Sequence, residues 1–207
     1  GIVYGQAMHR VASEFYRARQ EKREMELGQL KDIFTALWKP TGFISQQHER
    51  MRYEAGIRNI ERFYEAEKTG AIVPQYIEKD FEFKLSDDLV IVGRWDRIDM
   101  TEGKSRIIDY KTSNVKNAEE AEEKINSPQI INQLKLYALA YEKVFKKPVD
   151  EVAIYFLESG VMAVKKLRRD VIERHEKKLF EVAEEMKKGE YPATPGTHTC
   201  RYCAFNN

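Results

Sequence analysis

The sequence predicts a mixed α/β domain, and three features of its patterning carry that prediction. Apolar residues recur at helical spacing in the first third of the chain, and they alternate with polar residues in the middle. Helical spacing then returns before two further short apolar runs. The chain has 207 residues, of which 42% are hydrophobic and 33% are charged. This size and composition are typical of a globular domain with a sizeable core.

Three helices are expected before the strands begin. The first covers residues 3–27, where apolar side chains recur every three or four positions. A short helix over 31–38 and a long one over 45–69 follow. Ser45 is the candidate N-cap of the long helix, and Gly70 stands where a helix C-terminus favours a left-handed residue.

The middle of the chain changes to a period of two, which is typical of β-strands. In its first run, Ile77, Phe81, Phe83 and Leu85 share one parity. Short turns separate the successive runs, so we expect the strands to pair as an antiparallel meander. The predicted strands cover residues 76–85, 89–100 and 106–112.

Helical periodicity returns after the meander, and Pro148 stops it. Asp170 and Glu173 form a candidate capping pair for the last helix. The remaining residues, 190–207, are predicted to form a loop. The elements expected in this half are helices over 118–126 and 129–146, strands over 149–157 and 161–167, and a helix that ends near Gly189.

Charge and cysteine content exclude several classes of protein. The 35 Lys and Arg nearly balance the 34 Asp and Glu, which excludes a polybasic nucleic-acid coat and an acidic disordered tail. No apolar run is long enough to cross a membrane, and no signal peptide is visible. With Cys200 and Cys203 as its only cysteines, the chain is expected in a reducing, cytoplasmic setting. Because it lacks an initiator Met, we expect it to be part of a longer protein.

Charged residues inside the apolar strands mark the candidate site. Alternation puts Asp109 and Lys111 on one face of the third strand, and a hairpin with the second strand can bring Asp96 close to Asp109. Two converging carboxylates repel each other unless a cation lies between them, and Mg²⁺ takes such oxygen ligands. Lys111 would then orient a water or neutralise an oxyanion in metal-assisted hydrolysis. The alternative is a surface strand with a cross-strand ion pair.

Four other residues add to this pattern, although each alone is more often a core or surface residue. His9 lies at the border of the apolar stripe of the first helix. Gln133 and Tyr137 are four positions apart and share a face of the long helix after the meander. Gly93 marks a place in the second strand where the missing side chain allows a close backbone approach.

Together these residues resemble the RecB-like branch of the PD-(D/E)XK nuclease superfamily. The predicted order of helix, three strands, helix and strand is also that of the superfamily's restriction-endonuclease-like core, here with flanking helices. The resemblance implies a RecB-like nuclease domain over residues 1–189. The matching segments are Gly5-Gln6-Ala7-Met8-His9, Gly93 to Asp99, Ile107 to Thr112 and Gln133 to Tyr137.

The resemblance also implies roles for these residues. Lys111 would stand near the attacking water, and Gln133 and Tyr137 would support the site or contact the DNA. One or two Mg²⁺ or Mn²⁺ ions would serve as Lewis acid and as activator of water. The implied metal ligands are His9, Asp96, Asp109 and the main-chain carbonyl of Tyr110. The implied catalytic residues are Asp96, Asp109 and Lys111.

The function that the resemblance implies is that of a metal-dependent DNA nuclease. It would be an exonuclease on single strands or DNA ends, and the nuclease module of a helicase–nuclease in repair or recombination. DNA and a helicase domain or subunit are therefore the implied partners, and a membrane is not. The alternative is a catalytically inactive DNA-binding scaffold of the same fold. The complete set of ligand side chains and lysine favours activity.

The tail over residues 190–207 holds Cys200 and Cys203. They resemble the first two of three C-terminal cysteines that hold an iron–sulfur cluster in some relatives. The resemblance implies that a longer parent protein held a [4Fe–4S] cluster, with its other two cysteines outside this chain. The alternatives are two thiols in a loop without a special role, or a zinc module, for which two cysteines are too few ligands.

Overall fold

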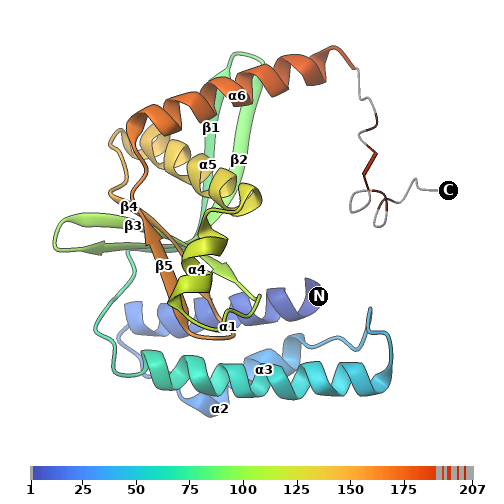
Figure 1. The fold of residues 1–207 in the computed structure, drawn as a ribbon. Helices are drawn as coiled ribbons and strands as arrows, with labels where there is room; N and C mark the ends of the chain where they lie inside the picture. Colours follow the sequence, from blue (N-terminus) through green and yellow to red (C-terminus); the bar gives the residue numbers. More distant parts are fainter. Residues whose placement is uncertain (1, 190–192, 194, 197–199, 201–202, 204–207) are drawn as a thin grey trace.

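The computed structural model describes residues 2–189 together with 193, 195, 196, 200 and 203. The fold is mixed α/β, as predicted, with a five-stranded sheet and helices on both of its faces (Figure 1). None of the helices in this described part is both long and apolar enough to cross a membrane. The elements are α1 (Ile2–Gln20), α2 (Leu27–Leu37), α3 (Gln46–Glu67), β1 (Tyr76–Ser86), β2 (Leu89–Thr101), β3 (Lys104–Lys111), α4 (Ala118–Ile125), α5 (Pro128–Phe145), β4 (Glu151–Phe156), β5 (Val161–Lys165) and α6 (Arg169–Lys187).

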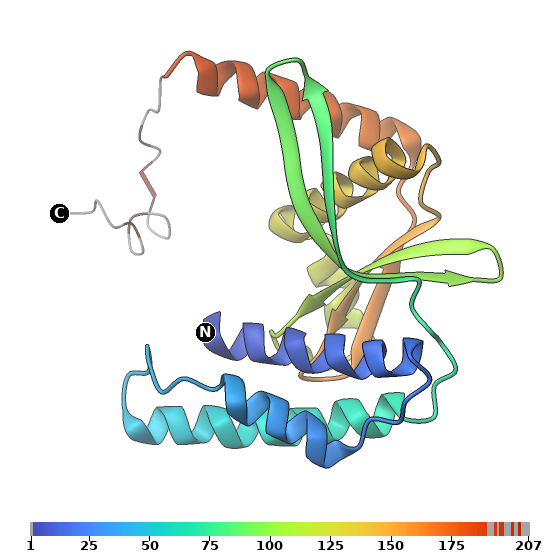
Figure 2. The ribbon, with the colours of Figure 1, turned by 180° about the vertical axis from the view of Figure 1, so that it is seen from behind.

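The sheet has the strand order β1-β2-β3-β4-β5. The first three strands pair antiparallel, so the predicted meander is confirmed. β3 and β4 pair in parallel because α4 and α5 return the chain to the end of the sheet where β3 began, and β5 is antiparallel to β4. Figure 2 shows β1 and β2 extending beyond the other strands as a long hairpin.

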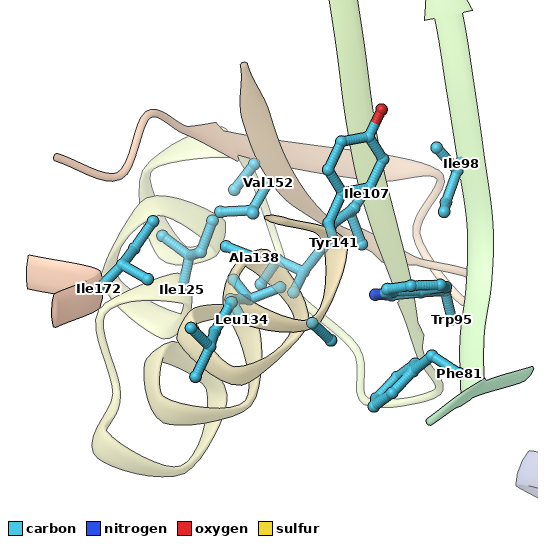
Figure 3. Packing of buried hydrophobic residues seen from close by; sticks show 14 of the residues in the cluster. Phe81, Trp95, Ile98, Ile107, Ile125, Leu134, Ala138, Tyr141, Val152 and Ile172 are labelled. Atoms are coloured by element: carbon cyan, nitrogen blue, oxygen red, sulfur yellow. The ribbon is translucent and has the colours of Figure 1, made fainter. Parts of the chain in front are cut away.

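Each face of the sheet carries its own hydrophobic core. Helices α4, α5 and α6 cover one face, and Figure 3 shows Ile107 and Val152 of the sheet and Leu134 of α5 among the buried side chains of the cluster there. Helices α1, α2 and α3 cover the other face, where the next residue of β3, Ile108, is equally buried. We call these the α5 core, which includes Phe81, Trp95, Ile107, Leu134 and Val152, and the α1 core, which includes Met8, Tyr16, Phe63, Ile108 and Tyr155.

β1 changes faces at Glu78. Ile77 packs against the α1 core, whereas Phe81 lies in the α5 core. The two residues have the same parity, so a regular strand would put them on one face of the sheet. The strand itself is confirmed, but Ile77 does not share a face with the other apolar residues of its run.

β2 changes faces at the same level. Trp95 lies in the α5 core, whereas the guanidinium of Arg97, two positions on, lies 4.0 Å from the ring centroid of Tyr16 in the α1 core. The pairing of β1 with β2 keeps one register across the change. Both strands therefore change faces together. As a result, the long hairpin that they form packs against both cores.

Gly93 makes room for an aromatic ring. A Cβ atom at this position would lie 2.3 Å from the ring of Phe81, which is far inside van der Waals contact. The ring of Phe81 packs in turn on Trp95, with 4.5 Å between the ring centroids. The missing side chain thus admits a side chain from β1 and not the close backbone approach that the sequence suggested.

One of the predicted helix caps is confirmed and two are wrong. Gly70 does not adopt the left-handed conformation predicted for it after α3, whose C-cap is Lys68. Ser45 caps α3 as predicted, because its hydroxyl accepts a hydrogen bond from the backbone N–H of His48 at 3.1 Å. The capping pair predicted for α6 is wrong. Arg168 is the N-cap residue, and its guanidinium donates to the carboxylate of Asp170 at 2.8 Å, while Glu173 accepts from Arg169 instead.

The first helix is shorter than the sequence suggests. α1 ends at Gln20, where the prediction extended it to residue 27. Lys22 follows in the left-handed conformation, with a φ of +56°, and this conformation ends a right-handed helix. The remaining apolar residues of the predicted stretch then belong to a turn and to the start of α2.

Candidate active site

The candidate site lies where β2 separates from β3, and we call this place the fork. Regular pairing of the two strands stops at the pair Arg97 and Ile108, so Asp96, the residue next to Arg97 in β2, has no strand partner in β3. The Oδ2 atom of Asp96 accepts a hydrogen bond from the backbone N–H of Tyr110 at 2.8 Å. A side-chain carboxylate thus takes the place of a strand partner for that N–H group, and this holds Asp96 at the fork between the strands.

His9 reaches the fork from α1. Its Nδ1 atom lies 3.5 Å from Oδ1 of Asp96, and its ring meets the ring of Tyr110 edge-on, with 5.6 Å between centroids. Burial alone lowers the pKa of His9, but the hydrogen bond to Asp96 and the charges of Asp96 and Asp109 outweigh it. The net effect of the two carboxylates is a raised pKa for His9.

Asp109 is the most deeply buried acid of the site. Its residue surface is 3% exposed, and burial is the main reason that its pKa rises from 3.8 to about 6. Lys111 opposes the rise, and the charge of Asp96 adds to it. The Nζ atom of Lys111 lies 2.6 Å from Oδ2 of Asp109 but out of line for a hydrogen bond, and this buried oxygen accepts none.

A chain of hydrogen bonds joins the site to α5. Lys111 Nζ donates to Gln133 Oε1 at 2.8 Å, and Gln133 Nε2 donates to the hydroxyl of Tyr137 at 3.0 Å. The carbonyl of Tyr137 accepts a hydrogen bond from the indole N–H of Trp95 at 3.2 Å. Burial, reinforced by the charges of Asp109 and Asp96, raises the pKa of Tyr137, which keeps its hydroxyl neutral.

The structure therefore brings the predicted site residues together from opposite sides of the sheet. α1 supplies His9 from one side, and α5 supplies the pair Gln133 and Tyr137 from the other. The strands supply the acids and the lysine between them. Within the described residues, no three His, Cys, Asp or Glu side chains lie close enough to form a complete metal site in this conformation.

A cleft lies beside His9, and Glu78 also lines it. Its volume is about 700 Å³, and both cationic and apolar side chains line it. The lining residues include Val3, Gln6, Arg10, Leu37, Lys39 and Glu78.

Two charged residues near the fork have roles that sequence reasoning missed. Asp99 is not available as a ligand, because both of its oxygens accept hydrogen bonds from Arg97 at 2.7 Å. Glu78 lies opposite the site in β1 and forms ion pairs with Arg10 and Arg17 of α1. The only sequence signal for Glu78 was a charged residue within an apolar strand.

The predicted cluster cysteines lie elsewhere in the chain. Cys200 is partly buried, Cys203 is exposed, and both are free thiols. Most of the predicted tail over 190–207 lies outside the described residues. The iron–sulfur site therefore stays a prediction.

Known proteins resemble this chain in sequence pattern and in fold. The family model of the PD-(D/E)XK nuclease superfamily matches residues 2–207. The chain belongs to the PD-(D/E)XK nuclease superfamily. Nucleases of this superfamily generally use divalent metal ions. Among curated proteins, none matches the chain.

Two solved structures align with this PD-(D/E)XK nuclease over most of its length. One is a protein from Eubacterium rectale described as a "Putative exonuclease", with a TM-score of 0.51 and 8% sequence identity. The alignment covers 98% of this chain and 80% of that one. The protein SSO0001 aligns with a TM-score of 0.40 and 15% identity, over 96% of this chain and 82% of its own.

Proposed function

We propose that this PD-(D/E)XK nuclease is a metal-dependent deoxyribonuclease of the RecB-like branch, acting on DNA ends or single strands. The observation that carries the proposal is the convergence of Asp96, Asp109 and Lys111 where β2 leaves β3. Two carboxylates can bind a divalent metal ion, and an ammonium beside them can stabilise developing negative charge. This combination suits metal-assisted hydrolysis of a phosphodiester.

The side chains at the fork suit a divalent cation such as Mg²⁺ or Mn²⁺. Asp109 holds a buried oxygen that accepts no hydrogen bond, and the neighbouring charge of Asp96 raises its pKa further. A cation between the two carboxylates would give the buried oxygen a partner, and it would reduce the repulsion between the two negative charges. When bound, the ion would supply Lewis acidity toward the phosphate and lower the pKa of a water. We assign as its ligands His9, Asp96, Asp109 and the main-chain carbonyl of Tyr110.

Lys111 is the proposed catalytic lysine. Its ammonium is fixed between the carboxylate of Asp109 and the amide oxygen of Gln133. An ammonium held there would stabilise the negative charge that develops on the phosphate oxygens and would orient the attacking water. Gln133 and Tyr137 act through Lys111 in this scheme, so we regard them as positioning residues, and their place on α5 would also let them face the DNA.

The DNA strand is proposed to approach the fork through the cleft beside His9. Arg10 and Lys39 line this cleft and would contact phosphates, and Leu37 and Val3 give it apolar walls. The net charge of the whole chain is only +1. Because sequence-independent DNA affinity scales with the number of cationic phosphate contacts, tight binding would need a partner, and we propose a helicase domain or subunit.

Two finer proposals rest on the family resemblance. The neighbour from Eubacterium rectale is described as a "Putative exonuclease", and we propose that mode of action for this chain as well. We also propose that Cys200 and Cys203, at C-x-x-C spacing, contribute to a [4Fe–4S] cluster completed outside this chain. Iron and sulfide analysis of the longer parent protein, purified without oxygen, would test the cluster.

Cleavage of end-labelled DNA tests the proposed activity. Single- and double-stranded substrates are incubated with Mg²⁺, Mn²⁺ or EDTA, with Asp109→Ala and Lys111→Ala as variants. Lys104→Ala is the matched control, because Lys104 is an exposed lysine at the other end of β3. We expect metal-dependent cleavage by the wild type and the control, and none by the two site variants.

The product ladder also separates the alternatives. Shortening from one labelled end indicates an exonuclease and gives its polarity, whereas internal fragments indicate an endonuclease. A folded wild-type protein that binds DNA but cleaves it with neither ion would support the inactive scaffold. Cleavage that persists in EDTA, or in the Asp109→Ala variant, would refute the metal-dependent mechanism.

A further inference from the structure

Glu78 adopts a backbone conformation that strands do not normally use. Its φ is +46°, in the left-handed region that is uncommon for residues other than glycine. Among the described residues, three other non-glycine residues have a positive φ, and each lies in a turn or at a helix end. Glu78 is the one that lies inside a strand, and such outliers persist only where the surrounding structure enforces them.

Glu78 lies at the level of Asp96 on the neighbouring strand. Ile77 is opposite Arg97 and Lys79 is opposite Trp95, so Glu78 falls at the position between these pairs. Both strands change faces here, and β2 leaves β3 at the same place. The turn-over of β1 at Glu78 is thus part of the geometry that leaves the Asp96 carboxylate free to reach the fork.

The side chain of Glu78 fastens this bend to α1. Its carboxylate accepts a hydrogen bond from Arg17 and lies 3.7 Å from the guanidinium of Arg10. Glu14 completes the cluster, at 2.9 Å from Arg10 and 2.8 Å from Arg17. Arg10 follows His9 in the sequence, so the cluster ties the bend to the helix that supplies the proposed histidine ligand.

We propose that Glu78 is a positioning residue for the metal site. Its left-handed backbone places Asp96 at the fork, and its carboxylate holds α1, and with it His9, against the same strand. The inference rests on the proposed function, because it concerns the same ligands. Glu78 is not assigned as a ligand, since two guanidinium groups already hold its carboxylate.

Three substitutions separate the backbone role from the side-chain role. Glu78→Gly keeps the left-handed conformation and removes the carboxylate. Glu78→Gln keeps the length of the side chain and removes its charge. Glu78→Val removes the carboxylate and disfavours the left-handed conformation, because Val is β-branched. The matched control is Glu102→Val, since Glu102 has a φ of +52° in the turn after β2, away from the fork.

The affinity for Mn²⁺, measured by calorimetry, is the readout that a merely structural role would not move. We expect Glu78→Val to raise the Kd for Mn²⁺ by about 10- to 100-fold, the range found for residues that orient metal ligands. Glu78→Gly and Glu78→Gln should weaken Mn²⁺ binding less than Glu78→Val does. Glu78→Gly keeps the left-handed backbone, and Glu78→Gln keeps the length of the side chain. Glu102→Val should lower the thermal stability and leave the Kd unchanged.

The result that overturns the inference is a wild-type Kd in folded Glu78→Val protein. If that variant does not fold, the other two decide: both must bind Mn²⁺ more weakly than the wild type, and a wild-type Kd in either overturns the inference. Failure of the wild type itself to bind Mn²⁺ would overturn the metal site, and the role of Glu78 with it. The two failures are distinguishable because the second is visible before any variant is made.

Discussion

Replacing Asp109 with Asn should stabilise the metal-free protein at pH 8, although it removes a residue of the proposed site. Burial, opposed in part by Lys111, raises the pKa of the Asp109 carboxyl from 3.8 to about 6. The folded protein at pH 8 therefore bears a cost for a buried carboxylate that the unfolded chain does not. A rise of about two pKa units corresponds to about 3 kcal/mol at about 1.36 kcal/mol per unit. This is the upper limit of the expected gain in the free energy of unfolding.

The pH dependence of this gain has a definite sign. Folding raises the pKa of Asp109 above its value of 3.8, so ionisation costs more in the folded state. The cost is absent below about pH 4, grows as the pH rises toward about 6, and is complete above about pH 7. The Asp109→Asn variant should therefore exceed the wild type in stability at pH 8 and match it near pH 4.

Asp99→Asn is a control with the opposite expectation. Asp99 is as deeply buried as Asp109, at 3% exposure, but both of its oxygens accept hydrogen bonds from Arg97. The Asp99→Asn variant would leave the buried guanidinium of Arg97 without its counter-charge. Removing one partner of a buried pair costs about 3–5 kcal/mol, so this variant should be strongly destabilised.

Urea unfolding followed by circular dichroism measures all of these differences. In EDTA at pH 8 the expected order of stability is Asp109→Asn, wild type, Asp99→Asn. Saturating Mn²⁺ should stabilise the wild type, because the ion binds only the folded state, and should add little to Asp109→Asn. An Asp109→Asn variant that is no more stable than the wild type in EDTA, or whose advantage is the same at pH 4, would refute the reasoning.

Three further predictions concern single contacts. Gly93→Ala should lower the free energy of unfolding by about 1–3 kcal/mol, because its Cβ would overlap the packed ring of Phe81; denaturant unfolding measures it. Ser45→Ala should cost about 1 kcal/mol by removing the N-cap of α3, with Ser86→Ala as a control outside any helix cap, and an equal loss in both would contradict this. Gln133→Leu should lower kcat for DNA cleavage by roughly tenfold to 100-fold, because Lys111 loses its acceptor, while the Kd for Mn²⁺ stays unchanged in calorimetry.

Most of the fold could be predicted because its elements obey local rules. The long helices show a 3.6-residue period, the meander shows a period of two, and Ser45 carries a capping side chain. The errors occur where a neighbouring residue or a local backbone conformation overrides the structure that the sequence pattern predicts. Arg168 takes the Asp170 carboxylate that would otherwise serve the helix end, and the left-handed Lys22 ends α1 within an apolar stretch.

The candidate site could be predicted as a set of residues but not as a geometry. The alternation of side chains predicts which face of the sheet each strand residue occupies, provided that the strand is regular along its whole length. This condition fails at Glu78 of β1 and Asp96 of β2, where both strands change faces. The turn-over depends on packing against two separate cores and on arginines of α1, which are distant in sequence. Nothing in the strand pattern of β1 signals it, since Glu is not a residue that favours the left-handed conformation.

Several exceptions to ordinary strand structure gather at one place, and this clustering supports a functional site. At the fork, a non-glycine strand residue is left-handed, a carboxylate replaces a strand partner, and a buried oxygen of Asp109 accepts no hydrogen bond. A few positions along the same sheet, Arg97 and Asp99 are equally buried, but both oxygens of Asp99 are hydrogen-bonded. The Asp99 carboxylate is thus hydrogen-bonded at both oxygens by a neighbouring arginine. The Asp109 carboxylate has the ammonium of Lys111 beside its Oδ2 atom, and it lies where we propose that a cation binds between it and Asp96.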